Sequence, residues 1–281
     1  MSPAQYLTHR PKGFAPTVSR WPADRAFRSA PGENTIGRST NTPAETPMSE
    51  SDEILAIPLW LNGHAYLTMP PAFFDVRDAR SGQIRRRTPL CGAREAQAAV
   101  DAACDALQSW ATLTVEARAR LLTRLAEALS GYADHFAGLI GEETGKDGAA
   151  AGAEVTAAVH VLRAVATAGA GTGGNGVVAV VSDQLAPLLG PLQLATPALL
   201  GGATIVLKPS PQAPSAAFAL AELTARAGFP GGVVNLLHGD LAAVEGLCSA
   251  PAVSMVRFAG DRELGTRVAA IATRHGKPFL D

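Results

Sequence analysis

Two short segments of the sequence carry residue types that bind phosphate or ribose oxygens. Lys208 directly follows the apolar run 204–207 and precedes Pro209-Ser210. The segment Gly260–Gly265, here named the glycine turn, directly follows the apolar run 253–258. Glycine lets a phosphate approach the backbone N–H groups at the start of a helix, and a lysine ammonium can meet a ribose or phosphate oxygen. A lysine at a strand end can equally be a solvated side chain, so both interpretations of Lys208 stay open.

The elements that must position these residues are strands and helices in alternation. Runs rich in β-branched and aliphatic residues predict strands that are buried on both faces, at 176–181, 204–207, 233–237 and 253–258. Segments of helix length separate them, and the clearest begins at Pro214-Ser215 and ends at Gly228 and Pro230. This alternation predicts an α/β fold with a doubly wound parallel sheet, whose ligands lie at the carboxyl ends of the strands.

The chain before these strands is predicted to form β-hairpins and then helices. The run 54–61 ends at Asn62-Gly63, and Ser81-Gly82 is the expected tip of a second hairpin. Apolar residues at helical spacing predict four helices between these hairpins and Gly176. The run Arg85-Arg86-Arg87 can bind phosphate or form a solvated strand face, and the pattern alone does not decide between them.

Composition excludes several classes of protein. The 281 residues include 24 basic and 25 acidic side chains, a balance that argues against nucleic acid as a partner. Apolar residues make up 47%, enough for a sizeable core. Cys91, Cys104 and Cys248 form no CxxC pair and no metal-binding spacing, which fits a reducing compartment, so we expect a cytoplasmic location. No apolar run approaches the ~18 residues of a membrane helix, so we expect no membrane partner.

The first 50 residues differ in composition from the rest. Seven of the 20 prolines lie in residues 1–47, and no apolar stretch follows the basic residues as it would in a secretory signal. The prolines and three acidic residues also count against a transit peptide. We therefore expect residues 1–50 to be a disordered extension, and Met48 is an alternative translation start.

Six stretches carry a family resemblance. They are LWLNGHA, FFDVRDARSGQI, EARARLLTRLAEAL, GEETGK, VRFAGDRELG and, most specifically, PALLGGATIVLKPSPQAPSAAFALAELTARAGFPGGVVNLLHG. Together they make residues 51–281 resemble the N-terminal half of the aldehyde dehydrogenase superfamily. The resemblance implies a variant Rossmann domain for NAD or NADP, in an enzyme whose cysteine thiolate attacks an aldehyde before hydride passes to the nicotinamide. It implies cofactor contacts from Lys208, Ser210, Phe258, Gly260, Leu264 and Gly265.

Three positions depart from the pattern of the family. Where the family has Pro-Trp-Asn-Phe-Pro, this chain has Asp183-Gln-Leu-Ala-Pro187. Leu185 therefore stands in the place of the Asn that steadies the oxyanion in the family. Losing one such donor typically costs about 3 kcal/mol of transition-state stabilisation. Pro211 replaces the acidic residue that holds the adenine ribose in the family, and Asp261 replaces the serine that contacts the pyrophosphate. A carboxylate about 4 Å from a phosphate charge costs roughly 1–4 kcal/mol. We therefore expect weak or lost dinucleotide binding.

The chain ends at Asp281, before the general base and the nucleophilic cysteine of the family would follow. None of the three cysteines is expected to replace that nucleophile, so no catalytic residue is assigned. One hypothesis is an aldehyde dehydrogenase-like oxidoreductase, inactive alone, that needs a separate polypeptide with the catalytic domain. The alternative is a non-catalytic nucleotide-binding or interaction module, or a truncated gene remnant. An uncovered apolar face should favour partner binding or self-association.

Overall fold

The central sheet is the frame on which the predicted site residues are arranged. The computed structural model describes residues 54–168 and 176–281, so the predicted disordered extension lies outside the described residues. Within the described part, seven strands form one sheet in the order β2-β1-β7-β6-β5-β8-β9. Its five parallel strands are β5 (Val177–Ser182), β6 (Thr204–Lys208), β7 (Val234–Leu236), β8 (Val253–Ala259) and β9 (Phe279–Leu280). The predicted parallel sheet is confirmed.

The order of the parallel strands reverses between β5 and β8. The chain moves outward from β5 to β6 and β7, and then returns to place β8 on the other side of β5. Ser182, the last residue of β5, pairs in register with Ala259, the last residue of β8. In open α/β sheets the crevice at such a reversal is where ligands bind, outside the carboxyl ends of the strands. The two candidate segments of the sequence therefore lie at the expected edge.

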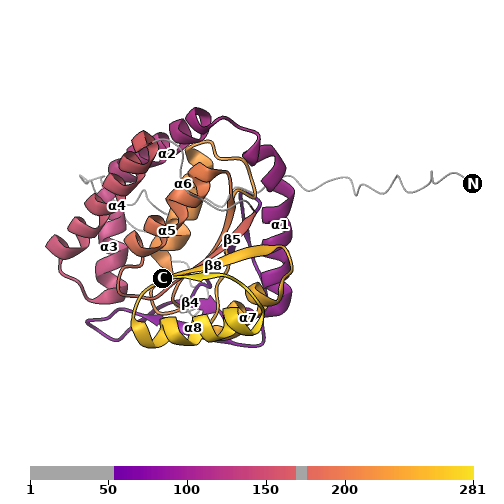
Figure 1. The fold of residues 1–281 in the computed structure, drawn as a ribbon. Coiled ribbons are helices and arrows are strands. Elements are labelled where there is room, and N and C mark those ends of the chain that lie inside the picture. The colour runs from indigo at the N-terminus through magenta and orange to yellow at the C-terminus, as the bar shows by residue number, and fades with distance from the viewer. Residues whose placement is uncertain (1–53, 169–175) are drawn as a thin grey trace, which may run out of the picture. The chain divides into compact units, whose positions relative to one another are not determined.

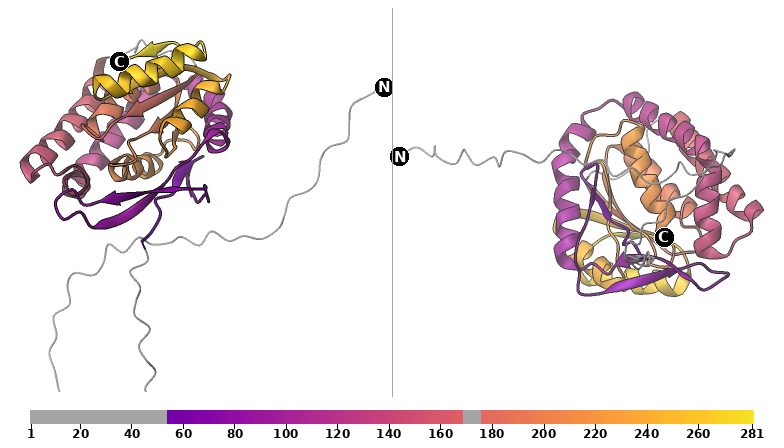
Figure 2. Two further views of the ribbon diagram at one scale, coloured as in Figure 1. Left: turned by 90° about the horizontal axis from the view of Figure 1, so that it is seen from below. Right: turned by 180° about the vertical axis from the view of Figure 1, so that it is seen from behind.

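Helices cover both faces of the sheet, as Figures 1 and 2 show. One face is covered by α5 (Leu189–Gly201) and α6 (Ser215–Arg226), and outside them lie α2 (Val115–Gly131), α3 (Ala133–Thr144) and α4 (Gly148–Ala168). The other face is covered by α1 (Ala93–Ala111), α7 (Leu241–Ser249) and α8 (Arg262–Arg274). The predicted doubly wound architecture, with helices before the sheet, is thereby confirmed.

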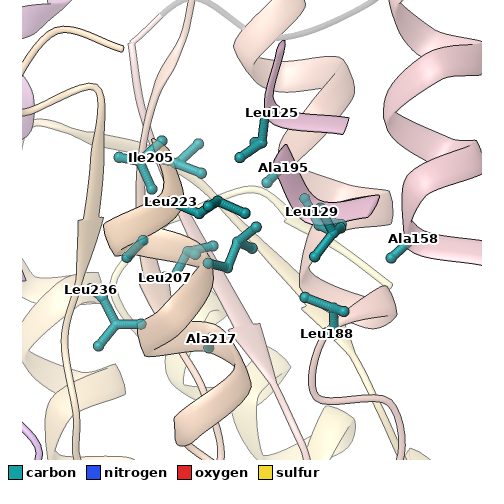
Figure 3. Packing of buried hydrophobic residues seen from close by; sticks show 14 of the residues in the cluster. Leu125, Leu129, Ala158, Leu188, Ala195, Ile205, Leu207, Ala217, Leu223 and Leu236 are labelled. Carbon is teal, nitrogen blue, oxygen red and sulfur yellow. The ribbon is translucent and has the colours of Figure 1, made fainter. Parts of the chain in front are cut away.

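Two apolar cores fill the space on either side of the sheet. Ile205 and Leu207 of β6 point to the side of α5 and α6, where Figure 3 shows them among Leu125, Leu129 and other aliphatic side chains. Val206 points to the opposite side, toward the helices α1, α7 and α8. This alternation follows from the two-residue period of a strand. It explains why the strand sequences are apolar without interruption.

The predicted hairpins form, and one of them extends the large sheet. Strands β1 (Leu59–Leu61) and β2 (His64–Tyr66) are joined by Asn62-Gly63, both with positive φ, at 51° and 79°. These angles suit the tight turns of two-residue hairpins. Strand β1 also pairs antiparallel with β7, and the Asn62 N–H donates to Asn235 Oδ1 at 3.0 Å. Strands β3 (Phe73–Arg77) and β4 (Ile84–Pro89) form a separate two-stranded sheet.

One helix in the described part, α4, has the length and mean hydropathy of a membrane-spanning helix. This is weak evidence, because buried core helices meet the same criteria. Helix α4 packs against α2, α3 and α5, and its apolar residues Val155 and Leu162 lie in the core. These contacts account for the buried residues of α4, which are a third of its apolar window.

The arginines of β4 pair with acidic side chains of the protein itself. Arg86 lies 2.6 Å from Glu142, and Arg87 lies 3.0 Å from Asp75. Arg86 also lies 3.5 Å from the buried carboxylate of Glu143, which accepts hydrogen bonds from the backbone N–H and the hydroxyl of Ser215. Glu143 thus caps the start of α6 from a different helix.

We expect Glu143 to make the stability of the fold depend on pH. Burial raises the pKa of Glu143 from 4.5 to about 7, although the hydrogen bonds from Ser215 oppose this. The folded state then holds the proton more tightly than the unfolded chain does. The stabilisation is complete below the unfolded pKa and is lost as pH rises through about 7. From about pH 5 to 8, the wild type should lose roughly 2–3 kcal/mol relative to Glu143→Gln.

Urea unfolding of both proteins across this pH range measures the difference. Glu142→Gln removes the neighbouring carboxylate, which is partly exposed, and serves as the matched control. It should keep most of the pH dependence of the wild type, because the charge of Glu142 is a smaller cause of the raised pKa of Glu143 than burial is. Parallel curves for the wild type and Glu143→Gln would show that the buried carboxyl does not titrate in this range.

Candidate functional site

Four aspartate or lysine side chains follow the parallel strands at their carboxyl ends. Lys208 ends β6, Asp183 follows β5, Asp261 follows β8, and Asp240 precedes α7 in the connection from β7. The register places Lys208 opposite Val181 of β5. The sequence therefore brings three carboxylates and one ammonium to the same edge of the sheet. Only Lys208 and the glycine turn were singled out at this edge from the sequence as phosphate-binding features.

Three of the predicted cofactor-contact residues, Phe258, Leu264 and Gly265, pack α8 against the sheet. Phe258 is buried in β8, and a Cβ added to Gly265 would lie 3.0 Å from its ring carbon Cε1. Gly265 therefore permits the close approach of α8 to β8. Leu264 packs against the core on the same side. Asp261 is the N-cap of α8, and its carboxylate accepts a hydrogen bond from the Leu264 N–H at 2.9 Å.

Lys208 is buried, and its charge is used within the protein. Its Nζ donates to the carbonyl oxygens of Pro209 and Gly239, both at 2.6 Å, which ties the end of β6 to the connection after β7. Burial lowers the pKa of Lys208 from 10.5 to about 8, and the charge of Asp240 opposes this. Lys208 as a whole is 4% exposed, so its ammonium group is not in contact with solvent at this edge of the sheet. The solvated alternative for Lys208 is therefore wrong.

Ser210 and Pro211 also make contacts within the protein. The Ser210 hydroxyl donates to Gln184 Oε1 at 3.3 Å and accepts from the Gln212 N–H at 3.2 Å. The carbonyl oxygen of Pro211 accepts from the Thr88 hydroxyl at 3.3 Å. Ser210 thus connects β6 to the segment after β5, which places it with Lys208 beside the reversal point of the sheet.

Asp183 is the residue at this edge whose role the sequence did not reveal. Its carboxylate accepts hydrogen bonds from the backbone N–H groups of Leu185 and Asp261, both at 2.7 Å. Its own N–H donates to Ala259 at 3.1 Å, and the residue is 2% exposed. The available signal was an aspartate directly after a strand that is buried on both faces. The adjacent Ser182 hydroxyl is buried and has no hydrogen-bond partner among the described residues.

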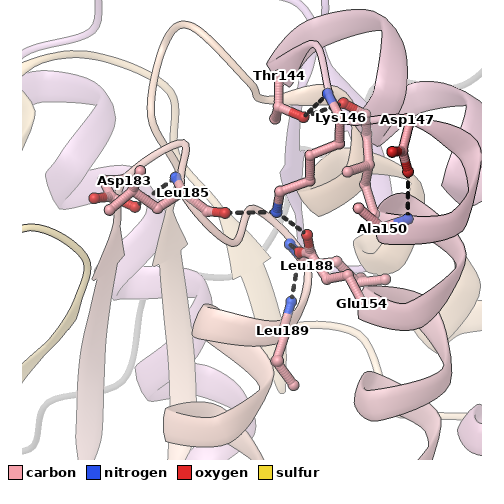
Figure 4. A network of polar contacts seen from close by, with 10 residues as sticks. Thr144, Lys146, Asp147, Ala150, Glu154, Asp183, Leu185, Leu188 and Leu189 are labelled. Atoms are coloured by element: carbon pink, nitrogen blue, oxygen red, sulfur yellow. Dashed lines mark hydrogen bonds and ion pairs between the residues drawn. The ribbon is translucent and has the colours of Figure 1, made fainter.

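The segment after β5 is fixed by an ion pair from α4. Lys146 Nζ lies 2.5 Å from Glu154 and donates to the Leu185 carbonyl oxygen at 2.6 Å, as Figure 4 shows. The other carboxylate oxygen of Glu154 accepts from the N–H groups of Leu188 and Leu189, at 3.0 and 3.2 Å. Glu154 therefore satisfies the free N–H groups at the start of α5. These contacts hold the backbone at Leu185, whose side chain is exposed.

The surroundings of all three cysteines raise the pKa of the thiol and so disfavour the nucleophilic thiolate. Burial raises the pKa of Cys91 to about 12 and that of Cys248 to about 11. The pKa of Cys104 is raised by burial and by Asp101 and Asp105. A thiol reacts through its thiolate, and nearby negative charge disfavours that form. Cationic side chains do lie near Cys91 and Cys248, but burial and a neighbouring glutamate outweigh them.

We predict that Cys91 and Cys248 of the folded protein react with a disulfide reagent orders of magnitude more slowly than a free thiol. Both side chains are about 1% exposed, whereas Cys104 is partly exposed. Colorimetric titration at neutral pH should therefore show at most one reactive thiol before denaturant is added and three afterwards. Cys104→Ser should abolish the native reaction. Two or more fast thiols in the native protein would contradict the burial.

Comparison with known proteins identifies the family of the chain. The family model described as "Aldehyde dehydrogenase family" matches residues 69–280, well over half of the chain. The chain belongs to the aldehyde dehydrogenase family. The sequence resemblance and the implied Rossmann-type fold are thereby confirmed.

The chain spans about half the length of the relatives that it matches in the aldehyde dehydrogenase family. The succinate-semialdehyde dehydrogenase [NADP(+)] of Escherichia coli is 34% identical over 69% of this chain and 44% of its own. A probable methylmalonate-semialdehyde/malonate-semialdehyde dehydrogenase of Dictyostelium discoideum is 30% identical over 78% of this chain and 45% of its own. Aldehyde dehydrogenase C of Pseudomonas syringae, solved with NAD+ and octanal, has a TM-score of 0.72, 26% identity and coverages of 79% and 50%.

The edge does not fit the dinucleotide that the aldehyde dehydrogenase family implies. The Asp261 N–H at the glycine turn already donates to a carboxylate, that of Asp183. Lys208 donates to two carbonyl oxygens and offers no solvated ammonium. Three aspartates line the edge, and a pyrophosphate would add two more negative charges. In water the repulsion is about 1 kcal/mol per pair of unit charges at 4 Å, and it is larger in a buried site.

Proposed function

We propose that this chain is an aldehyde dehydrogenase-like protein that does not oxidise aldehydes through its own residues. The burial of Cys91 and Cys248 and the raised pKa of all three thiols carry the proposal, because aldehyde oxidation in the family begins with a cysteine thiolate. Leu185 supports it, since this exposed aliphatic side chain stands where the family pattern has the oxyanion donor. In this proposal the family's dinucleotide, NAD or NADP, is bound weakly or not at all.

The test is an aldehyde oxidation assay on the purified chain. Succinate semialdehyde is a suitable probe, because a relative is named for its oxidation. Formation of NADH or NADPH is followed by absorbance with each cofactor in turn. We expect no rate above the background without protein. Aldehyde-dependent turnover would overturn the proposal, and loss of that turnover in one cysteine variant would identify the nucleophile.

A second candidate function is a binding module for a polypeptide partner. The last residue of β2, Tyr66, and the segment after it, with Leu67 and Met69, have exposed fractions of 51%, 75% and 86%. Several large apolar side chains close together on a surface favour association. The proposed partner is a separate polypeptide with the catalytic domain, or a second copy of this chain. The free cysteines support a proposed cytoplasmic location for either role.

We predict that Leu67→Ser combined with Met69→Ser weakens association of the purified chain. Both side chains are more exposed than buried, so the folded monomer should keep its thermal midpoint. Sedimentation velocity over a range of concentrations compares the variant with the wild type. If the wild type remains monomeric up to about 100 μM, the proposed self-association through this segment is wrong.

A further inference from the structure

The glycine turn has the geometry of an anion cradle. Gly260 has φ +156°, and a Cβ built there would lie 2.5 Å from Asp183 Oδ2. The residue must therefore be glycine for the carboxylate to approach the backbone. The next N–H, that of Asp261, points at the same oxygen and donates to it at 2.7 Å. Helix α8 begins directly afterwards, and helix starts favour negative charge.

We propose that the Asp183 carboxylate is a built-in occupant of the anion position at the glycine turn and excludes a dinucleotide pyrophosphate from it. A phosphate at a glycine turn needs the absence of a side chain and a free backbone N–H, and here both are taken by Asp183. Asp183 directly follows β5, the strand on the other side of the reversal point from β8. The inference concerns which anion the turn holds, so it does not depend on whether the chain oxidises aldehydes.

The Asp183 carboxylate is held in the glycine turn by hydrogen bonds from neighbouring backbone N–H groups. Displacing it breaks the hydrogen bonds from the Leu185 and Asp261 N–H groups. The Leu185 backbone is itself held by Lys146, so the segment after β5 cannot easily move away. The carboxylate is almost fully buried, and a phosphate added beside it would meet its charge at low local dielectric.

The experiment compares NAD+ binding by the wild type and Asp183 variants, using isothermal titration calorimetry. Asp183→Ala opens the turn and frees the Asp261 N–H, so we expect its affinity to rise at least tenfold. Because this change removes two hydrogen bonds, Asp183→Ser is made alongside it, and the thermal midpoint reports folding. The matched control is Asp240→Ser, which removes a carboxylate from the N-cap of α7 at the same edge. We expect a change of less than about threefold there, since that carboxylate is outside the turn.

Each outcome decides the matter. A tenfold gain in a folded Asp183 variant with little change in the control supports the proposal. An equal gain in the control would assign the effect to general charge and overturn it, as would folded Asp183 variants with no gain. A measurement on the wild type is independent of these variants. Its Asp261 amide resonance should stay in place on addition of NAD+ up to about 10 mM, and a saturable shift would overturn the proposal.

Discussion

Replacement of Glu154 by alanine is expected to lower the free energy of unfolding by about 3 kcal/mol. The Glu154 side chain is 5% exposed, and its loss leaves two N–H groups at the start of α5 without their acceptor. It also leaves the Lys146 ammonium without its counter-charge, with the Leu185 carbonyl oxygen as its remaining acceptor. Removing one partner of a buried pair costs about 3–5 kcal/mol. The lower end applies, because the Lys146 side chain is 28% exposed and regains some hydration.

Two further variants separate charge from hydrogen bonding. Glu154→Gln keeps an oxygen for the start of α5 but removes the charge, so it should lose less stability than alanine. Lys146→Met combined with Glu154→Ala should be more stable than the sum of the single losses predicts, by at least about 1 kcal/mol. Urea unfolding measures all of them. A Glu154→Ala protein within about 0.5 kcal/mol of the wild type would refute the role of this pair.

Replacement of Trp110 by alanine is expected to cost about 3–5 kcal/mol. The indole is fully buried, stacks on Phe229 with ring centroids 5.5 Å apart, and donates to the Leu199 carbonyl oxygen at 3.1 Å. Aromatic residues make up only 5% of the chain, so few other side chains can fill the space. The large change leaves a cavity beside the C-terminal turn of α5.

Trp110→Phe is the matched control for the size of the side chain. Phenylalanine keeps the stacking on Phe229 but leaves the Leu199 carbonyl oxygen without its donor, so a loss of about 1–3 kcal/mol is expected. Chemical denaturation of the three proteins should rank them wild type, phenylalanine, alanine. Equal stability of the two variants would show that the hydrogen bond, rather than the volume, dominates at this position.

The sheet could be predicted because its strands carry a strong local signal. The run 204–207 is apolar without interruption, as burial on both faces requires, and β6 covers it. Gly228 has φ +89°, and α6 ends just before it, as the sequence indicated. The short strand β9 and the antiparallel pairing of β1 with β7 were not predicted. Both depend on contacts between residues far apart in the chain rather than on local pattern.

The candidate site was predictable in place but not in contacts. The position of Lys208 at a strand end followed from the pattern, whereas its hydrogen bond to Gly239 depends on how the next connection returns to the sheet. Asp183 and Asp261 are 78 residues apart, and their contact exists only because β5 and β8 are neighbours. Sequence alone showed that a proline position of the family holds Asp183. It could not show that the carboxylate turns into the glycine turn.

A calorimetric titration of the wild-type chain with NAD+ and with NADP+ tests the central claim most directly. The claim is that the carboxyl edge of this sheet is closed to a pyrophosphate by the protein's own carboxylates. It predicts no saturable binding of either dinucleotide below about 1 mM. A dissociation constant in the micromolar range for either one would contradict it.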